Sequence, residues 1–266
     1  METKKYRVNY PDFMVSQLKE NCLWIKFSGN FFHNFISFDN RDFLHDYFIE
    51  VSKDKEIKTV VIESSYSESG SDEYLRFFLM ECPNMDIGHF GFTNTMDRYE
   101  LHRFCNIIDQ TILDIVSMDA FVIHVCKGDV LSVFMNISLA CDYKIISTNT
   151  VFHNVYQEIG MLPKGGGPFF LSNLIGQAKT CELLMMQPVI NAEEALENKI
   201  ADLVVPVENL ESSALEVSKK LAQIQKKTLT GTKRLINYSL KDLKSYLKFE
   251  TEEIIKIGQQ DEFFNQ

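Results

Sequence analysis

The chain has 266 residues, of which 45% are hydrophobic and 21 are Phe, enough for one large domain, or one domain plus a small appendage, with a substantial core. A formal net charge of −10 argues against nucleic acid as a partner, and an anionic ligand would need a locally basic site. The N-terminus lacks the apolar segment of a signal peptide, and no run of 18 apolar residues occurs. We therefore expect a cytosolic protein that does not bind a membrane.

The first half of the chain predicts strands and amphipathic helices separated by polar turns. Apolar and β-branched runs predict strands at 23–27 and 59–63, and apolar residues at helical spacing predict helices over 38–51 and 99–116. A Ser/Glu turn follows the second strand at 67–72. The stretch 82–99 is rich in Asn, Asp, Gly and Pro and is typical of a loop or lid.

The second half begins with a strand, a sharp turn, a buried helix, a second strand and a glycine-rich turn. These predicted elements are the strand 121–125, the turn 127–129, the helix 130–140, the strand 143–146 and the turn 160–168. A helix that opens just after a strand points free backbone N–H groups at whatever lies before it. That geometry suits a negative charge developing on a carbonyl oxygen.

The remaining segments predict two helices, one strand and then further helices. Helices are expected over 178–186, 192–198 and 210–224, with a strand over 200–205 between the second and the third. The Lys-rich and then Glu-rich tail is typical of solvated helix faces. The six cysteines have no metal-ligand spacing and lie mostly among apolar residues, so we expect reduced core cysteines and no metal site: Cys22, Cys82, Cys105, Cys126, Cys141 and Cys181.

An ordered series of short motifs resembles the crotonase superfamily, the enoyl-CoA hydratases and isomerases. The series starts with the strand, glycine turn and helix described above, and it extends over about 23–263. Its later members are Cys141-Asp142, Phe152, Gly160, Pro163 with the glycines after it, Leu174-Ile175-Gly176, Glu182-Leu183-Leu184 and 192–195.

The resemblance implies a fold and an assembly. The fold is α/β, a spiral of repeated ββα units that form two sheets, with a C-terminal helical region. We expect the spiral core over 1–207 and the helical region, used for trimerisation or as a lid, over 208–266. The expected assembly is a homotrimer or a dimer of trimers.

The resemblance also implies an oxyanion hole made of two backbone N–H groups that hold a thioester oxygen. Gly70 and Asp72 fit the family pattern and place one donor at Ser71, although this turn by itself also fits a solvated segment with no role. Val133 supplies the second donor. The residues expected beside the substrate are Asn34, Ser69, Gly70, Gly128 and Phe134. Near Asn34 the chain lacks the proline and the lysine that the family usually carries.

The two acid/base glutamates of the hydratases correspond to Asn136 and Tyr156, so neither position is acidic. Asn136 can orient a water molecule, and Tyr156 can donate a proton. Glu158 would lie on the same side as Tyr156 in an extended segment, the alternative being a surface carboxylate. His89, His153 and Asn154 are further candidates that also fit surface roles.

The expected function is enolate chemistry on an acyl thioester, bound as acyl-CoA or on an acyl carrier protein. Isomerisation, decarboxylation or thioester cleavage is expected rather than hydration, with coenzyme A present only as part of the substrate. Members of the family that lack both glutamates include decarboxylases of polyketide pathways. The alternative is a catalytically silent subunit that binds a thioester or serves assembly.

Overall fold

The computed structural model describes residues 6–10, 12–19, 22–27, 34, 37–64, 98–154, 156 and 161–264, the side chains of residues 98 and 258–264 excepted. Within these residues the chain forms a seven-stranded sheet and a three-stranded sheet. The large sheet has the order β1 (Asn9–Tyr10), β2 (Met14–Lys19), β3 (Cys22–Phe27), β4 (Thr59–Ser64), β5 (Phe121–Cys126), β7 (Tyr143–Ser147), β10 (Leu203–Val205). The small sheet has the order β6 (Asp129–Leu131), β8 (Val151–His153), β9 (Val189–Asn191).

Strand direction divides the large sheet into two parts. The first three strands are antiparallel, whereas β3, β4, β5, β7 and β10 run parallel to one another. The carboxyl ends of the parallel strands therefore meet at one edge, where ligands of α/β proteins commonly bind. In the small sheet β6 and β8 are parallel and β9 is antiparallel to β8.

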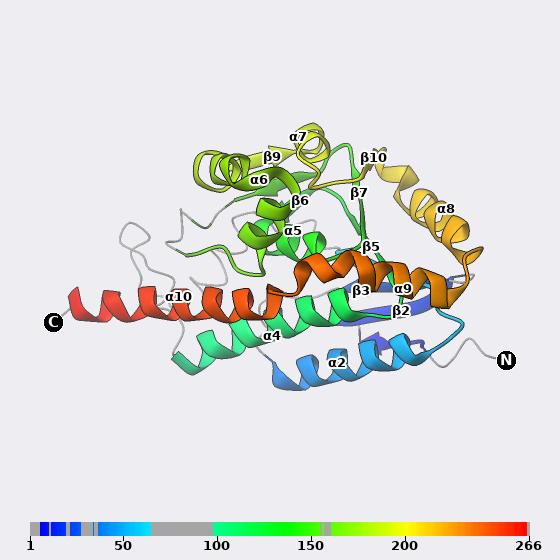
Figure 1. Ribbon diagram of the computed structural model, residues 1–266, viewed down its shortest axis with the longest axis horizontal. Helices are drawn as coiled ribbons and strands as arrows, with labels where there is room; N and C mark the ends of the chain where they lie inside the picture. The colour runs from blue at the N-terminus through cyan, green and yellow to red at the C-terminus, as the bar shows by residue number, and fades with distance from the viewer. Residues whose placement is uncertain are drawn as a thin grey trace.

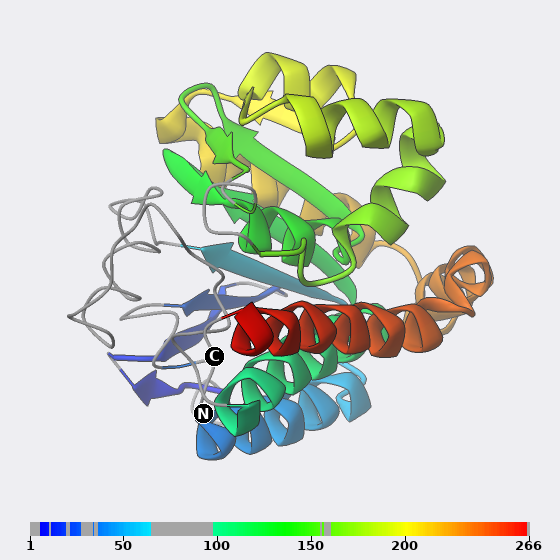
Figure 2. The same cartoon turned by 90° about the vertical axis from the view of Figure 1, so that its left-hand side faces the viewer.

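Helices cover both faces of the large sheet, as Figures 1 and 2 show. Helix α2 packs on α4, and α10 lies along the other side of α4. Helix α8 lies against β4, β5 and β7. The helices are α2 (Phe38–Lys53), α4 (Arg98–Ser117), α5 (Ser132–Leu139), α6 (Gly167–Met186), α7 (Ala192–Glu197), α8 (Leu210–Ala222), α9 (Lys226–Asn237) and α10 (Leu243–Phe264), with 3-10 turns η3 (Val207–Asn209) and η4 (Tyr238–Leu240).

The alternation of side chains along the strands produces two cores. Val122 and Cys126 of β5 join the larger core, which also contains residues of α2, α4, α5 and α10. Ile123 and Val125 point to the opposite face and pack with Ala214 of α8. Burial on both faces explains why these strands read as nearly continuous apolar runs.

Three predicted boundaries were wrong. Residues 129–131 form strand β6, so the buried helix starts at Ser132 instead of residue 130. Helix α6 starts at Gly167 instead of residue 178, because Pro168 fits a first helical turn; Gly176 (φ 79°, ψ 162°) has non-helical backbone angles and divides α6 at a kink, and the predicted helix corresponds to the segment after this kink. Strand β10 starts at Leu203, because Lys199, with φ 60°, turns the chain before it.

The prediction that the cysteines lie in the core is confirmed for four residues and is wrong for one. Cys22, Cys105, Cys126 and Cys141 are free and buried, whereas Cys181 is exposed on α6. Cys82 lies outside the described residues. No group of metal-ligating side chains occurs among the residues that the structure describes.

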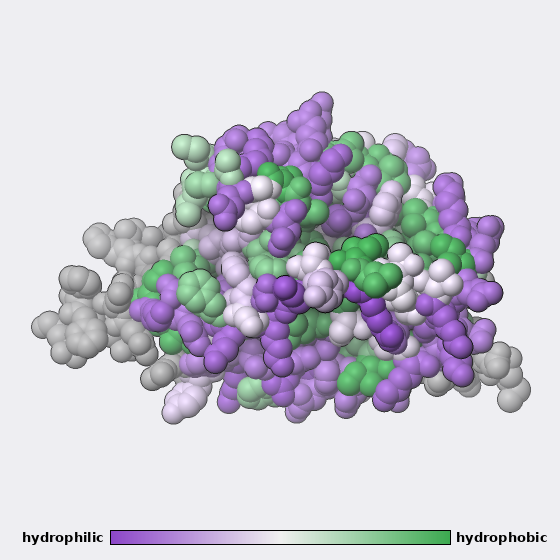
Figure 3. All heavy atoms as spheres, in the orientation of Figure 1, coloured by the Kyte–Doolittle hydropathy of each residue, from purple (hydrophilic) through white to green (hydrophobic). Residues whose placement is uncertain are grey.

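The surface of Figure 3 is mostly hydrophilic, with a hydrophobic group over α9. Leu235 and Ile236 of α9 are exposed, as is Tyr238 just beyond it. Among the described helices, none combines the length and the apolar character needed to cross a membrane.

Candidate functional site

The first turn of α5 has backbone N–H groups that form no hydrogen bond with the side chain of the N-cap residue. The N-cap residue is Leu131, which has extended backbone angles and a side chain without an acceptor. Val133 is the second residue of the helix, so its N–H belongs to the first turn. The helix has no earlier turn whose carbonyl oxygen could accept a hydrogen bond from it. Gly128, with φ 68°, allows the turn that leads from β5 into β6. The second oxyanion donor predicted from sequence therefore lies at a helix N-terminus.

Asn136 and Tyr156, the two positions predicted to replace the glutamates, are in direct contact. Asn136 Nδ2 donates to Tyr156 Oη at 2.8 Å and to the carbonyl oxygen of Lys164, also at 2.8 Å. Tyr156 Oη donates to the same carbonyl at 3.3 Å. Asn136 is completely buried and Tyr156 is 2% exposed. The two side chains and this carbonyl form one closed hydrogen-bonded group.

Burial keeps the Tyr156 phenol neutral. Desolvation raises the pKa of Tyr156 well above that of an ordinary tyrosine, and nearby Glu250 adds to the rise. The Ser132 hydroxyl, one turn before Asn136 on α5, acts on this pKa in the opposite direction. Tyr156 consequently stays protonated at neutral pH and can act as a hydrogen-bond donor but not as a base.

Gly167 lets the glycine-rich turn approach Asn136 closely. A Cβ atom at this position would lie 2.3 Å from Asn136 Oδ1 and 2.6 Å from its Cγ. The amide cannot move away freely, because its Nδ2 is bound to Tyr156 and Lys164. Asn136 Oδ1 itself has no hydrogen-bond partner in the described part of the chain.

This contact predicts that Gly167→Ala and Asn136→Ala are strongly coupled. Gly167→Ala should lower the free energy of unfolding by about 1–3 kcal/mol, since the new methyl overpacks a pinned amide. Asn136→Ala removes the obstacle, so the double variant should be clearly more stable than the sum of the two single changes predicts. Urea unfolding of the four proteins measures the coupling, and simple additivity would contradict the described packing.

Lys164, which the sequence analysis did not single out, forms a buried ion cluster behind this group. Its side chain is completely buried, and Nζ forms an ion pair with Asp109 of α4 and binds Glu250 Oε1 and Thr251 Oγ1 of α10 at 3.0 Å each. Glu250 also accepts from Gly165 N at 2.8 Å and from Gly166 N at 3.0 Å. A fully buried lysine is rare without paired carboxylates, but a lysine in a glycine-rich turn carries no such signal in sequence.

A second buried polar pair lies on the strands. Ser64 Oγ and His124 Nε2 are 2.7 Å apart on β4 and β5, and His124 Nδ1 has no partner within the described residues. Burial, together with the charge of Lys144, lowers the pKa of His124 to about 3. Ser64 is the last residue described before the predicted Ser71 turn. The pattern of apolar residues in the sequence could not predict this buried pair, because each of the two residues lies in a strand rich in β-branched residues.

Of the other predicted site residues, some lie within the described part of the chain and some do not. Asn34 is buried and donates to the Asp12 carbonyl oxygen at 2.9 Å. His153 pairs with Asp129 at 2.7 Å, and Asn154 Nδ2 donates to carbonyl oxygens in and just after the last turn of α6. Phe134 is buried in α5. The predictions for Ser69, Gly70, Ser71, His89 and Glu158 lie outside the described residues.

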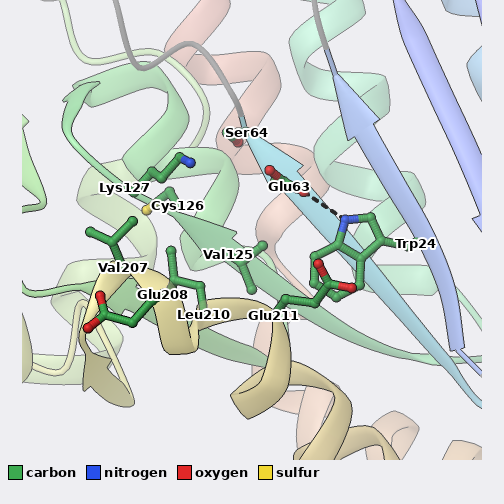
Figure 4. A pocket seen from close by; sticks show the side chains of 10 residues that line it. All are labelled: Trp24, Glu63, Ser64, Val125, Cys126, Lys127, Val207, Glu208, Leu210 and Glu211. Atoms are coloured by element: carbon green, nitrogen blue, oxygen red, sulfur yellow. Dashed lines mark hydrogen bonds between the residues drawn. The ribbon is translucent and has the colours of Figure 1, made fainter. Parts of the chain in front are cut away.

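A hollow of about 200 Å³ lies at the carboxyl edge of the large sheet, between the strand ends and the segment formed by η3 and the start of α8 (Figure 4). Trp24, Val125 and Leu210 line it and belong to the core on the α8 face. Glu63 accepts a hydrogen bond from Trp24 Nε1 at 2.7 Å in its wall. Neither Asn136 nor Tyr156 lines this hollow.

Comparison with known proteins identifies the family. Residues 94–264 match the family model described as Enoyl-CoA hydratase/isomerase, and the chain belongs to this family. It is similar to the short-chain-enoyl-CoA hydratase of Clostridium acetobutylicum, with 26% identity over 209 residues that cover 78% of this chain and 75% of that protein.

Other relatives match over shorter stretches. The trans-2-decenoyl-[acyl-carrier-protein] isomerase of Streptococcus mutans is 30% identical over 115 residues, 43% of this chain and 44% of that protein. A probable mitochondrial enoyl-CoA hydratase of Dictyostelium discoideum is 28% identical over 138 residues, 52% of this chain and 50% of that protein. The matched stretch thus spans about half the length of each of these two relatives.

Solved structures confirm the predicted fold. The enoyl-CoA hydratase of Bacillus halodurans superposes with a TM-score of 0.78 at 18% identity, covering 94% of this chain and 96% of that chain. An enoyl-CoA hydratase of Mycobacterium avium subsp. paratuberculosis gives 0.69 at 20% identity, covering 90% and 87%. The protein therefore has the α/β crotonase fold with C-terminal helices.

Proposed function

We propose that this protein binds an acyl thioester and stabilises an enolate on it. The observation that carries the proposal is the first turn of α5, where Val133 presents an N–H that the N-cap side chain leaves uncovered, one turn before Asn136. A donor held there needs no reorganisation when negative charge forms on the thioester oxygen. Ser71 is the proposed second donor, and Asn34, Ser69, Gly70, Gly128 and Phe134 are the proposed substrate contacts.

The proposed reaction is isomerisation, decarboxylation or thioester cleavage; the first two are isomerase and lyase reactions, the types we favour. Tyr156 is the proposed proton donor, with Asn136 orienting it and Glu158 as a further acid/base group. The thioester handle is coenzyme A or a carrier protein. Both handles occur in the names of the relatives, an enoyl-CoA hydratase and an acyl-carrier-protein isomerase.

A second candidate function is a catalytically silent subunit that binds a thioester or serves assembly. It is favoured by the closed hydrogen-bonded group, in which Asn136 Nδ2 already donates twice and Tyr156 is almost completely buried. We propose a homotrimer or a dimer of trimers for either function. The exposed apolar residues Leu235 and Ile236 of α9 are consistent with a further interface.

The test is to incubate the protein with a panel of acyl-CoA and acyl-carrier thioesters and to follow products by mass spectrometry. Val133→Pro removes the proposed donor, and Val133→Ala is the matched control because it keeps the N–H. We expect Val133→Pro to lower turnover by about 10²–10³-fold and Val133→Ala to retain most of it. Binding without any turnover would favour the silent subunit, and the absence of both would overturn the thioester proposal.

A further inference from the structure

We infer that Lys164 is a positioning residue, whose buried side chain holds its own carbonyl oxygen in place for Asn136 and Tyr156. The inference rests on the proposed function, which assigns Tyr156 as proton donor. Two sets of contacts meet in this one residue. Its ammonium group binds two helices, and its carbonyl oxygen binds the candidate acid/base pair.

The side-chain contacts fix the turn to the helices around it. Asp109 belongs to α4, and Glu250 and Thr251 belong to α10, so one ammonium group joins two helices that lie side by side. Thr251 Oγ1 also donates to Asp109 Oδ2 at 3.0 Å, which links the two helices a second time. Displacing Lys164 would leave two buried carboxylates without their cation, a costly state that opposes movement of the turn.

Glu250 adds a second hold on the same turn. Gly165 and Gly166 have φ values of 98° and 76°, which favour glycine. Their successive N–H groups donate to the two oxygens of the Glu250 carboxylate. The three residues 164–166 are therefore bound at the ammonium group and at two backbone N–H groups.

The carbonyl contacts determine how the acid/base pair is oriented. The carbonyl oxygen of Lys164 can only accept, so the group at 2.8 Å from it must be the NH₂ of the Asn136 amide. The second amide hydrogen then points to Tyr156 Oη, which accepts it. The phenol hydrogen is thereby directed away from Asn136. The position of one carbonyl thus sets both the amide orientation and the direction of the Tyr156 proton.

The experiment reads the surroundings of Tyr156 directly and needs no substrate. The full chain is labelled with 3-fluorotyrosine, and Tyr156→Phe assigns the ¹⁹F resonance of residue 156. Lys164→Met removes the ammonium group, and Glu250→Gln is a milder change that keeps Lys164. Lys233→Met is the matched control, because Lys233 is also buried and ion-paired but binds Asp142 and carbonyls of residues 115 and 120.

We expect Lys164→Met to shift or broaden the Tyr156 resonance, Glu250→Gln to do so less, and Lys233→Met to leave it in place despite a similar loss of stability. An unchanged resonance in folded Lys164→Met would overturn the inference. If Lys164→Met does not fold, an unchanged resonance in Glu250→Gln overturns it and a shifted one supports it. A shifted Tyr156 resonance in Lys164→Met, together with no thioester turnover by the wild type, would contradict the proposed function but support the role of Lys164. The two outcomes are separable because the spectrum is recorded without substrate.

Discussion

The wild-type protein is expected to hydrate crotonyl-CoA very slowly or not at all. Hydration needs one group to take a proton from water and another to deliver a proton to carbon. Asn136 has no titratable proton, and burial raises the pKa of Tyr156 further from neutrality. Loss of one general acid or base typically costs about 10²–10⁴-fold, and paired losses do not simply multiply. Loss of absorbance of the enoyl thioester measures the rate.

The double variant Asn136→Glu, Tyr156→Glu tests whether the rest of the site is competent. If the oxyanion hole is intact, the two carboxylates should confer weak hydration. Circular dichroism must show a folded protein, since both positions are buried beside the Lys164 carbonyl oxygen. A folded, thioester-binding variant without hydration would point to a degraded hole, with the bulk of Val133 and Phe134 as the first cause to examine. A wild-type rate near the diffusional ceiling would contradict the assignment of the site.

Protonation of His124 is expected to make the protein sensitive to acid. In the unfolded chain this histidine has a pKa of about 6.5, whereas in the folded protein burial lowers the pKa to about 3. Between these values the unfolded state binds a proton that the folded state does not, so the free energy of unfolding falls as the pH falls. From pH 7 to pH 4 the contribution of this one group is about 3 kcal/mol.

The measurement is denaturant unfolding at several pH values for three proteins. His124→Gln should lose less stability on acidification than the wild type, by about 3 kcal/mol at pH 4. Ser64→Ala is the control, because it removes the hydroxyl next to His124 Nε2 but keeps the buried imidazole. Its loss of stability should depend on pH as in the wild type. Equal pH dependence in His124→Gln and the wild type would show that His124 is not the acid-sensitive group.

The sequence by itself determined the fold class and the position of most elements. Val60, Val61 and Ile62 of β4 are all buried, as their unbroken apolar run predicts for a parallel strand covered on both faces. Amphipathic spacing placed α2 and α4 to within two residues of their ends. These signals are local, because side-chain direction repeats with the period of the element itself. The helical segment that starts at Gly167 was missed, since glycine is as common in a turn as at a helix end.

Only the tertiary structure decided what surrounds the candidate site. The resemblance placed Asn136 and Tyr156 at equivalent positions, but their mutual hydrogen bond depends on two segments that meet across 20 residues of chain. The ion cluster joins Asp109, Lys164 and Glu250, which are far apart in sequence and look there like ordinary surface charges. Likewise, Ser64 and His124 become neighbours only through the pairing of β4 with β5. A charged or polar residue looks the same in the sequence whether it lies in solvent or in a core. Its partner, its burial and its pKa depend on how the rest of the chain packs around it, and this packing decides whether it can belong to a site.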